Sequence, residues 1–295
     1  MRKLEWQPIG YLFIAPAVVL FIVFVFIPIF ASLFFSFTHF DVLHPPRWVG
    51  LQNFITIITA DPRFWKAFRN TVLYVIGVVP TGISLALLLA VALEELTRGK
   101  QLFKILYFVP TVTSVVAVAV IWKWLFAGEK FGLINYALMQ FGVQPIDWLL
   151  DPKWILPAIM IMSIWAGLGY NVVFFSAGLS TIPSTLYEAA KVDGAGWWQR
   201  LWHITLPALR PTLIFVVVMS VANSFQVFDQ AYIITGGTGE GVGGVLDGGL
   251  TLVSYLYEQG FQRFRMGYAS AIAYIMFGCV FGLTLFNIRA LRANK

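Results

Sequence analysis

The chain has 295 residues, of which 59% are hydrophobic and 12% are charged, and its mean hydropathy is +0.79. Soluble domains carry about 25% charged residues, so this composition excludes a disordered chain or an ordinary water-soluble one and predicts a membrane protein. The formal net charge is +6, but the basic residues are scattered between apolar segments, which argues against a nucleic-acid partner. The single cysteine, Cys279, excludes an intramolecular disulfide, and we interpret it as a small buried apolar residue.

Six apolar segments follow one another along the chain, each long enough to cross about 30 Å of hydrocarbon as a helix. They cover residues 11–37, 70–93, 105–126, 154–179, 211–228 and 266–288. The first is far longer than the apolar run of a signal peptide, so we expect an uncleaved span. The fifth could continue as a helix through residues 231–235. The chain is therefore predicted to be an all-α integral membrane protein with six transmembrane helices.

The distribution of charge predicts the orientation of these spans. Six spans place both termini on one side, and that side then holds 11 of the 20 Lys and Arg residues but 5 of the 14 acidic residues. Cytoplasmic segments of membrane proteins are enriched in Lys and Arg. We therefore expect a multi-pass protein of the cytoplasmic (inner) membrane with cytoplasmic N- and C-termini.

The middles of the six segments contain no Asp, Glu, Lys, Arg or His; Lys123 and Asp229 lie near segment ends. Ion-driven transporters usually need intramembrane ionisable groups, because those groups carry the coupling charge. No internal repeat of the kind found in many secondary transporters is visible either. If the protein transports a solute, its energy is expected to come from another chain.

Residues 182–207, between the fourth and fifth segments, form a polar loop unlike the others. Thr185 and Glu188 have the T-x-x-E spacing of a capping box, which predicts a short helix to about Val192. Gly194 would end that helix in a left-handed conformation, and a second tryptophan-rich helix would follow, with Pro207 starting the next span. An interfacial amphipathic helix with tryptophans at the lipid headgroups is the alternative interpretation of this loop.

The loop also carries a family signature. Glu188-Ala189-Ala190, then Gly194, then Ile204 and Leu206-Pro207 match the EAA motif at every position. The chain thus resembles permease subunits of binding-protein-dependent ABC importers. The resemblance implies a type I importer permease fold in which this cytoplasmic loop docks on an ATP-binding subunit. The residues implied to couple the two subunits are Glu188, Ala189, Ala190, Asp193, Gly194, Ile204, Leu206 and Pro207.

Further stretches are similar to the carbohydrate-uptake branch, to the first permease subunit of maltose-, lactose- and sn-glycerol-3-phosphate-type systems. They are Gly50-Leu51-Gln52-Asn53-Phe54, Arg69-Asn70-Thr71, Trp122-Lys123-Trp124-Leu125-Phe126, residues 177–183, Val227-Phe228-Asp229 and Gly267-Tyr268-Ala269-Ser270-Ala271. The implied organisation is an N-terminal tail, first span and outer loop over 1–66, a permease core over 67–289, and a cytoplasmic tail over 290–295. The core spans lie at about 70–93, 105–126, 154–179, 211–235 and 266–288.

The chain departs from this branch after the fifth span. Relatives usually have a short T-x-G-G-P loop there, whereas Thr235-Gly236-Gly237 leads here into a glycine-rich stretch, 238–249, that lacks the proline. The stretch does not have the G-x-x-x-x-G-K-[ST] pattern of a phosphate loop, and neither does Gly99-Lys100, which has Glu94 at the first glycine position. We interpret it as a flexible outer loop.

The resemblance implies the partners and cofactors of such a subunit. They are a second permease, two ATP-binding subunits and an extracytoplasmic solute-binding protein, with ATP and Mg held by the ATP-binding subunits and no cofactor on this chain. An integral membrane enzyme is the alternative class, but no paired carboxylates, H-E-x-x-H or G-x-S-x-G are present. His39, His44 and His203 are too dispersed for a metal site.

A polar stripe on two of the apolar segments is the candidate substrate path. It consists of Ser163, Gly167, Tyr170 and Asn171 on the fourth and Ser220, Asn223 and Ser224, with Val227 beyond them, on the fifth. The spacings place each set on one helix face. Hydroxyls and amides suit a sugar or another neutral polyol, and the ring of Tyr170 could stack on a sugar. A glycerol 3-phosphate importer remains an alternative, as does close packing of the two helices through small residues.

Overall fold

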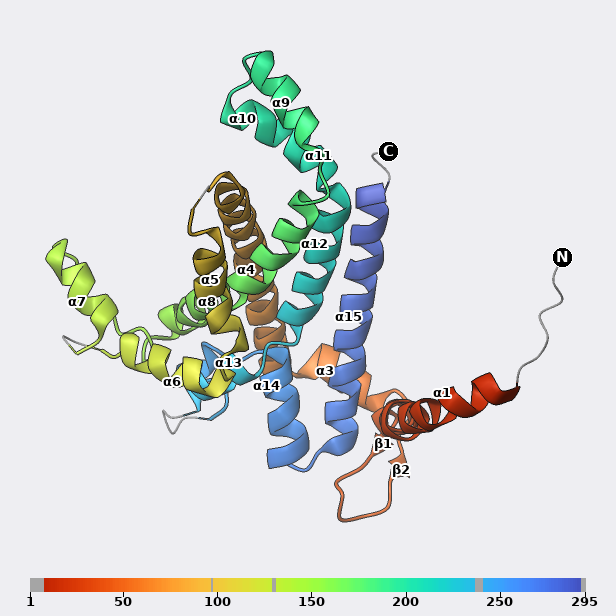
Figure 1. Ribbon diagram of the computed structural model, residues 1–295. Helices are drawn as coiled ribbons and strands as arrows, with labels where there is room; N and C mark the ends of the chain where they lie inside the picture. The colour runs from red at the N-terminus through yellow and green to blue at the C-terminus, as the bar shows by residue number, and fades with distance from the viewer. Residues whose placement is uncertain (1–7, 97, 129–130, 237–240, 293–295) are drawn as a thin grey trace. The chain divides into compact units, whose positions relative to one another are not determined.

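The computed structural model describes residues 8–96, 98–128, 131–236 and 241–292, and these are mostly helical (Figure 1). The long and short helices are α1 (Pro8–Phe21), η1 (Ile22–Phe26), α2 (Ile27–Ser36), α3 (Gln52–Ala60), α4 (Pro62–Glu95), α5 (Lys100–Val112), α6 (Val115–Leu125), α7 (Leu133–Gln140), α8 (Pro152–Leu179), α9 (Ser184–Val192), α10 (Trp197–Arg200), η2 (Leu201–Thr205), α11 (Leu206–Ala208), α12 (Arg210–Phe225), α13 (Asp229–Thr235), η3 (Val245–Asp247), α14 (Leu252–Tyr257), η4 (Glu258–Gln262) and α15 (Met266–Arg292). Two short strands, β1 (Thr38–His39) and β2 (Arg47–Trp48), pair antiparallel, with Thr38 opposite Trp48. The chain divides into two units. The first unit consists of the residues up to Asp61 together with Leu256–Ile275, and the second consists of Pro62–Tyr255 together with the residues from Met276 onward.

The first unit contains the N-terminal apolar helix, which runs from Tyr11 to Ser36 through α1, η1 and α2. A small polar junction closes the turn that follows it. The amide of Asn53 on α3 donates hydrogen bonds to the carbonyls of Ser36 and Thr38, both at 2.9 Å. At Gly267, near the start of α15, a Cβ atom would lie 2.0 Å from the carbonyl oxygen of Thr38, so only glycine allows this close packing.

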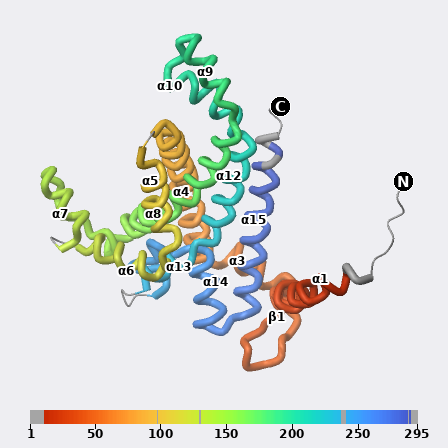
Figure 2. The backbone as a smooth tube through the Cα atoms, viewed as in Figure 1, coloured from red at the N-terminus to blue at the C-terminus, as the bar shows by residue number. Residues whose placement is uncertain are grey.

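The second unit is built around α4, α8 and α12, which pack alongside one another (Figures 1 and 2). α4 has 34 residues and is therefore about 50 Å long. α5 lies against α8, and the contact depends on Gly169, where a Cβ atom would meet the carbonyl oxygen of Tyr107 at 2.0 Å. Buried apolar residues from these helices, among them Ala86 and Phe175, form the core between them.

The third predicted span is not a single helix. α5 and α6 meet at an angle of 97°, because Thr113 and Ser114 between them adopt extended ψ values of 144° and 127° that interrupt the helical hydrogen bonds. The segment predicted over 105–126 is therefore built from two helices. Within the described residues, five helices are long and apolar enough to cross a membrane, and the bent pair makes six if it counts as one span.

The fifth span is interrupted as well. α12 ends at Phe225, the backbone of Gln226, Val227 and Phe228 is irregular, and the chain resumes a helix at Asp229. The expected continuation through residues 231–235 is confirmed, but as a separate helix, α13. The remaining spans agree with the predicted segments to within a few residues, apart from α4, which begins eight residues earlier.

Candidate functional site

The loop between α8 and α12 folds into two short helical arms. The first arm, α9, begins at Ser184, directly after Pro183, whose extended backbone (φ −59°, ψ 130°) serves as the cap residue. The predicted capping box is therefore wrong, because Thr185 is already the second residue of the helix and no side chain caps it. The proline stops the preceding turn and places the helix start one position ahead of Thr185.

The end of α9 agrees with the prediction. Gly194 has φ +77°. The amide of Ala195 donates a 2.8 Å hydrogen bond to the carbonyl of Ala190, and the amide of Gly194 donates a 3.1 Å hydrogen bond to the carbonyl of Lys191. This pair of bonds is a Schellman motif, which needs a residue in the left-handed region at the Gly194 position. The turn sends the chain back toward the membrane-spanning helices.

The second arm consists of α10, η2 and α11 in direct succession, and Gln199 caps it by accepting a 2.7 Å hydrogen bond from the amide of Gly196. The hydroxyl groups of Tyr187 and Thr205 lie 3.0 Å apart and join the two arms. The next span begins at Arg210, so the prediction that Pro207 starts it is wrong by three residues.

Apolar packing and one ion pair fix this loop to the ends of the long helices. Leu201 and Leu209 are buried in the same cluster as Val91 of α4. The guanidinium of Arg200 lies 3.5 Å from the carboxylate of Glu95, the last residue of α4. The loop is therefore attached to the end of α4.

The predicted coupling residues divide into an exposed and a partly buried set. Glu188, Ala189, Asp193, Gly194 and Pro207 are exposed, whereas Ala190, Ile204 and Leu206 are partly buried. The tip of the loop also exposes large apolar side chains; Val192 is 88% exposed and Trp202 63%. Acidic and apolar groups thus share one accessible surface of the loop.

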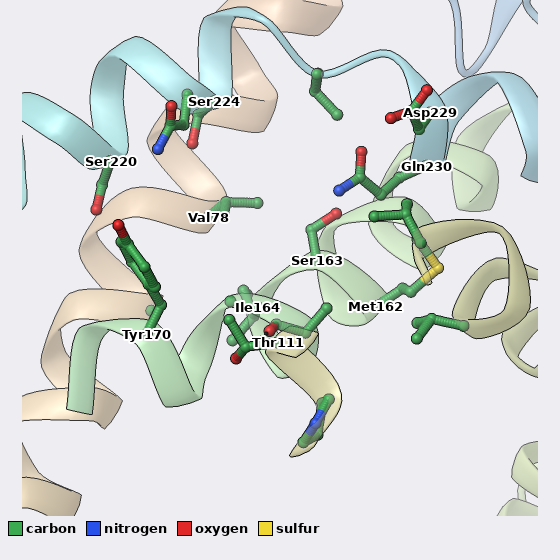
Figure 3. Close-up of a pocket in the computed structure, with 18 of the residues that line it drawn as sticks. Val78, Thr111, Met162, Ser163, Ile164, Tyr170, Ser220, Ser224, Asp229 and Gln230 are labelled. Atoms are coloured by element: carbon green, nitrogen blue, oxygen red, sulfur yellow. Dashed lines mark hydrogen bonds between the residues drawn. The ribbon is translucent and has the colours of Figure 1, made fainter. Parts of the chain in front are cut away.

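A cavity of about 510 Å³ lies between α4, α5, α6, α8, α12 and α13. All seven predicted path residues line it: Ser163, Gly167, Tyr170, Asn171, Ser220, Asn223 and Ser224, together with Val227. Figure 3 shows Tyr170 on α8 and Ser220 on α12 pointing their hydroxyl groups toward one another. The two helix faces expected from spacing are therefore brought together around one space.

The lining of the cavity mixes polar and apolar groups and carries little charge. Hydroxyl and amide groups from both sides point into it, and Tyr170 presents a half-exposed ring whose edge meets Phe174 at a centroid distance of 4.7 Å. Among the described residues that line the cavity, Asp229 is the one with a charged side chain, and none is Arg, Lys or His. Such a lining can hydrogen-bond an uncharged polyol and offers no cation to an anionic group.

Some lining residues were missed by the sequence reasoning. Tyr74 and Gly82 on α4, Thr111 on α5, and Gln226 and Gln230 at the break after α12 also face the cavity. Tyr74 and Gly82 are eight residues apart and thus share a helix face, so a polar residue in an otherwise apolar segment was the available signal. The contribution of Gln226 and Gln230 depends on the helix break, which the sequence did not reveal.

Comparisons with known proteins agree with these features. Residues 82–293 match the family described as binding-protein-dependent transport system inner membrane component. The chain is 40% identical over 278 residues to the probable ABC transporter permease protein YesP of Bacillus subtilis, covering 94% of this chain and 88% of that one. It is 36% identical to the lactose transport system permease protein LacF of Rhizobium radiobacter, covering 97% and 95%. Its fold is similar to a chain of a bacterial alginate ABC transporter solved with an alginate pentasaccharide-bound periplasmic protein, with a TM-score of 0.83, 22% identity, and coverage of 99% of each chain.

Proposed function

Because the chain belongs to the binding-protein-dependent transport system inner membrane components, we propose that it carries a neutral sugar or oligosaccharide across the inner membrane through the cavity between α4, α8 and α12. The resemblance to carbohydrate-uptake permeases is confirmed by this family and by the relatives named above. A transport subunit, rather than an enzyme, is confirmed in the same way. The substrate and the roles of individual residues are part of the proposal.

The lining of the cavity is the observation that carries the proposal. Sugars are bound through many hydrogen bonds to hydroxyls and through contact with aromatic rings, and the cavity supplies Ser220, Asn223, Asn171 and the ring of Tyr170. Glycerol 3-phosphate would require cationic partners for its phosphate. None of the described lining residues is cationic, so a neutral sugar is favoured over this alternative.

We further propose that the energy comes from ATP hydrolysed on partner chains. The sequence has no G-x-x-x-x-G-K-[ST] motif, and the loop carrying Glu188 and Gly194 presents acidic and apolar groups suited to docking in a cleft of another protein. The proposed assembly has a second permease, two ATP-binding subunits that hold ATP and Mg, and an extracytoplasmic solute-binding protein.

The two ends of α4 support the orientation that we propose. Arg200 of the loop contacts Glu95 at its C-terminal end, whereas Arg63, near its N-terminal end, contacts residue Asp247. About 50 Å of helix separates these ends, so they lie on opposite sides of a bilayer. Placing the Arg200 end in the cytoplasm satisfies the distribution of Lys and Arg and puts both termini there.

An uptake assay tests the proposed substrate class. The whole transporter, reconstituted in liposomes with its binding protein, would be offered radiolabelled lactose, maltotriose, a uronic-acid disaccharide and glycerol 3-phosphate. We expect ATP-dependent uptake of at least one neutral sugar and none of the two anions. Uptake restricted to an anion would refute the proposal.

Paired variants of Tyr170 link that uptake to the cavity. Tyr170→Leu removes the ring and should lower uptake of the sugar roughly fivefold, the equivalent of about 1 kcal/mol for an aromatic contact. Tyr170→Phe keeps the ring and should lose less than Tyr170→Leu. Equal uptake by all three proteins would show that the sugar does not pass this surface.

A further inference from the structure

The glycine-rich stretch after α13 is a hydrogen-bonded structure over residues 241–252, which corrects the expectation of a flexible loop; residues 237–240 of that stretch lie outside the described residues. Its glycines serve close packing. A Cβ atom at Gly248 would lie 2.7 Å from the carbonyl oxygen of Pro152, and one at Gly249 would lie 2.6 Å from the side chain of Ile155. Larger residues at these positions would push the stretch away from the start of α8.

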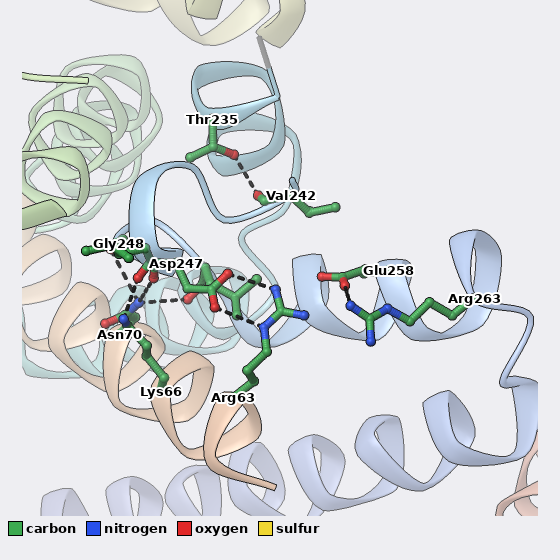
Figure 4. Close-up of polar contacts among 11 residues, drawn as sticks. Arg63, Lys66, Asn70, Thr235, Val242, Asp247, Gly248, Glu258 and Arg263 are labelled. Atoms are coloured by element: carbon green, nitrogen blue, oxygen red, sulfur yellow. Dashed lines mark hydrogen bonds and ion pairs between the residues drawn. The ribbon is translucent and has the colours of Figure 1, made fainter. Parts of the chain in front are cut away.

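One face of α4 holds this stretch. Arg63 forms a forked ion pair with Asp247, its Nε and Nη2 lying 2.9 and 2.8 Å from the two carboxylate oxygens (Figure 4). Lys66 bonds to the carbonyl of Leu246. The amide nitrogen of Asn70 lies 3.0, 3.3 and 3.1 Å from the carbonyl oxygens of Asp247, Gly248 and Leu250. The three α4 residues are spaced at i, i+3 and i+7, which places them on a single face.

The same attachment continues to the wall of the cavity. The buried hydroxyl of Thr71 accepts a 2.9 Å bond from the amide of Leu252. Next to it, the hydroxyl of Thr251 donates a 3.0 Å bond to the carbonyl of Val227. Val227 is in the middle of the break between α12 and α13. The break supplies Gln226 and Phe228 to the cavity lining, and the first turn of α13 supplies Gln230.

This bond matters because, among the hydrogen bonds described for the break, the carbonyl of Val227 accepts from Thr251, whereas the carbonyl of Phe228 accepts a 2.7 Å bond from the amide of Tyr232 in the following helix. A buried carbonyl without a hydrogen bond costs about 1–3 kcal/mol, and Thr251, which is fully buried, supplies that bond from outside the span. The position of the break, and with it one wall of the cavity, therefore depends on residues 241–252 and on the α4 face that holds them.

We infer that residues 241–252 position the Gln226–Gln230 wall of the sugar cavity, with Asn70 and Thr251 as positioning residues. This inference rests on the proposed function, since it assigns the glycine-rich stretch to the substrate site. Neither residue needs to touch the sugar. Thr251 acts on the carbonyl of Val227 directly, and Asn70 acts on it through the backbone of residues 247–250.

Two variants of Thr251 test the chain of contacts. The complete transporter, with its binding protein loaded with the neutral sugar that shows uptake, would be arrested with vanadate and the retained radiolabelled sugar counted. Thr251→Val removes the hydroxyl at nearly constant volume and should lower retention roughly fivefold, as expected for one lost buried hydrogen bond. Thr251→Ser keeps the hydroxyl and should stay within about twofold of the wild type.

A second set of variants and two control measurements distinguish a positioning role from misfolding. Asn70→Leu should also lower retention, and the double variant Asn70→Leu/Thr251→Val should lose less than the product of the two single losses, because both act on one carbonyl. Co-purification of the partner subunits and basal ATPase activity should be unchanged in all variants; a parallel loss of these would indicate a merely structural role and overturn the inference.

The outcomes also distinguish the two proposals. A wild-type transporter that retains no sugar contradicts the proposed function. A wild type that retains sugar, with Thr251→Val retaining the same amount, leaves the proposed function intact and overturns the positioning role.

Discussion

At the scale of single residues, Gly194 has an unusual backbone angle but free space around the position of a Cβ atom. Its φ of +77° requires a residue tolerant of the left-handed region, yet nothing in the described chain lies within 4 Å of where its Cβ would be. An internal clash therefore cannot account for a requirement for glycine here. Any such requirement beyond the turn itself would come from a partner surface that approaches this position.

Asparagine makes this distinction testable, because it tolerates the left-handed region better than other non-glycine residues. We expect Gly194→Asn to keep the turn, and both Gly194→Asn and Gly194→Glu to insert normally into the membrane. If a partner packs closely on Gly194, both should reduce sugar uptake per ATP hydrolysed at least about tenfold. The measurement is uptake and ATPase rate in the same liposomes. Normal coupling in Gly194→Glu would contradict the coupling role of this loop.

Short-range signals explain which residues could be predicted. Gly194 was found because a glycine after a helical segment has a conformational meaning that does not depend on the fold. The stripe from Ser163 to Asn171 was found because helical spacing alone determines a face. Thr185 was misassigned because Ser184 follows Pro183 directly, and two adjacent candidate start positions cannot be separated by composition.

At the scale of elements, the contact between α5 and α8 depends on the absence of a side chain at Gly169. Gly167, two residues earlier on the same helix, lines the cavity, and nothing lies within 4 Å of its Cβ position. The two glycines therefore form a matched pair. One allows backbone contact between helices, and the other faces open space.

We expect Gly169→Ala to destabilise the protein by about 1–3 kcal/mol, because the added methyl group forces α5 away from α8. Gly167→Ala should leave stability unchanged or slightly raise it, since alanine is the better helix former. Thermal unfolding of the detergent-solubilised transporter, followed by loss of its monodisperse elution, measures both. Equal melting temperatures for the two variants would show that the α5–α8 contact is not tight.

The elements that the sequence did not predict have two causes. The 97° bend between α5 and α6 lies inside an apolar run, and the break at Gln226–Phe228 lies at the end of one, and hydropathy carries no periodic signal that would mark either interruption. The structure of residues 241–252 depends on Arg63 and Asn70, about 180 positions away in sequence. Glycine content alone suggested flexibility, whereas the long-range contacts make these glycines packing residues.

At the scale of the whole chain, α4 connects the two proposed functional features of its unit, the loop and the cavity. Its first turns hold residues 241–252, its middle lines the cavity through Tyr74 and Gly82, and its last residue contacts Arg200 of the loop. A displacement of the loop by a partner would thus act on the same helix that supports the cavity wall. Rigid helices of this kind can carry coupling between distant sites when both sites bias one element.

The orientation proposed for α4 is open to a direct labelling experiment, since Cys279 is the single cysteine of the chain. In a Cys279→Ser background, Leu246→Cys and Val192→Cys would place one thiol at each end of α4. Both positions are well exposed, at 72% and 88%. A membrane-impermeant maleimide added to intact cells should label Leu246→Cys, whereas Val192→Cys should react only after permeabilisation. The reverse pattern would invert the topology and place the loop outside, where no ATP-binding subunit could reach it.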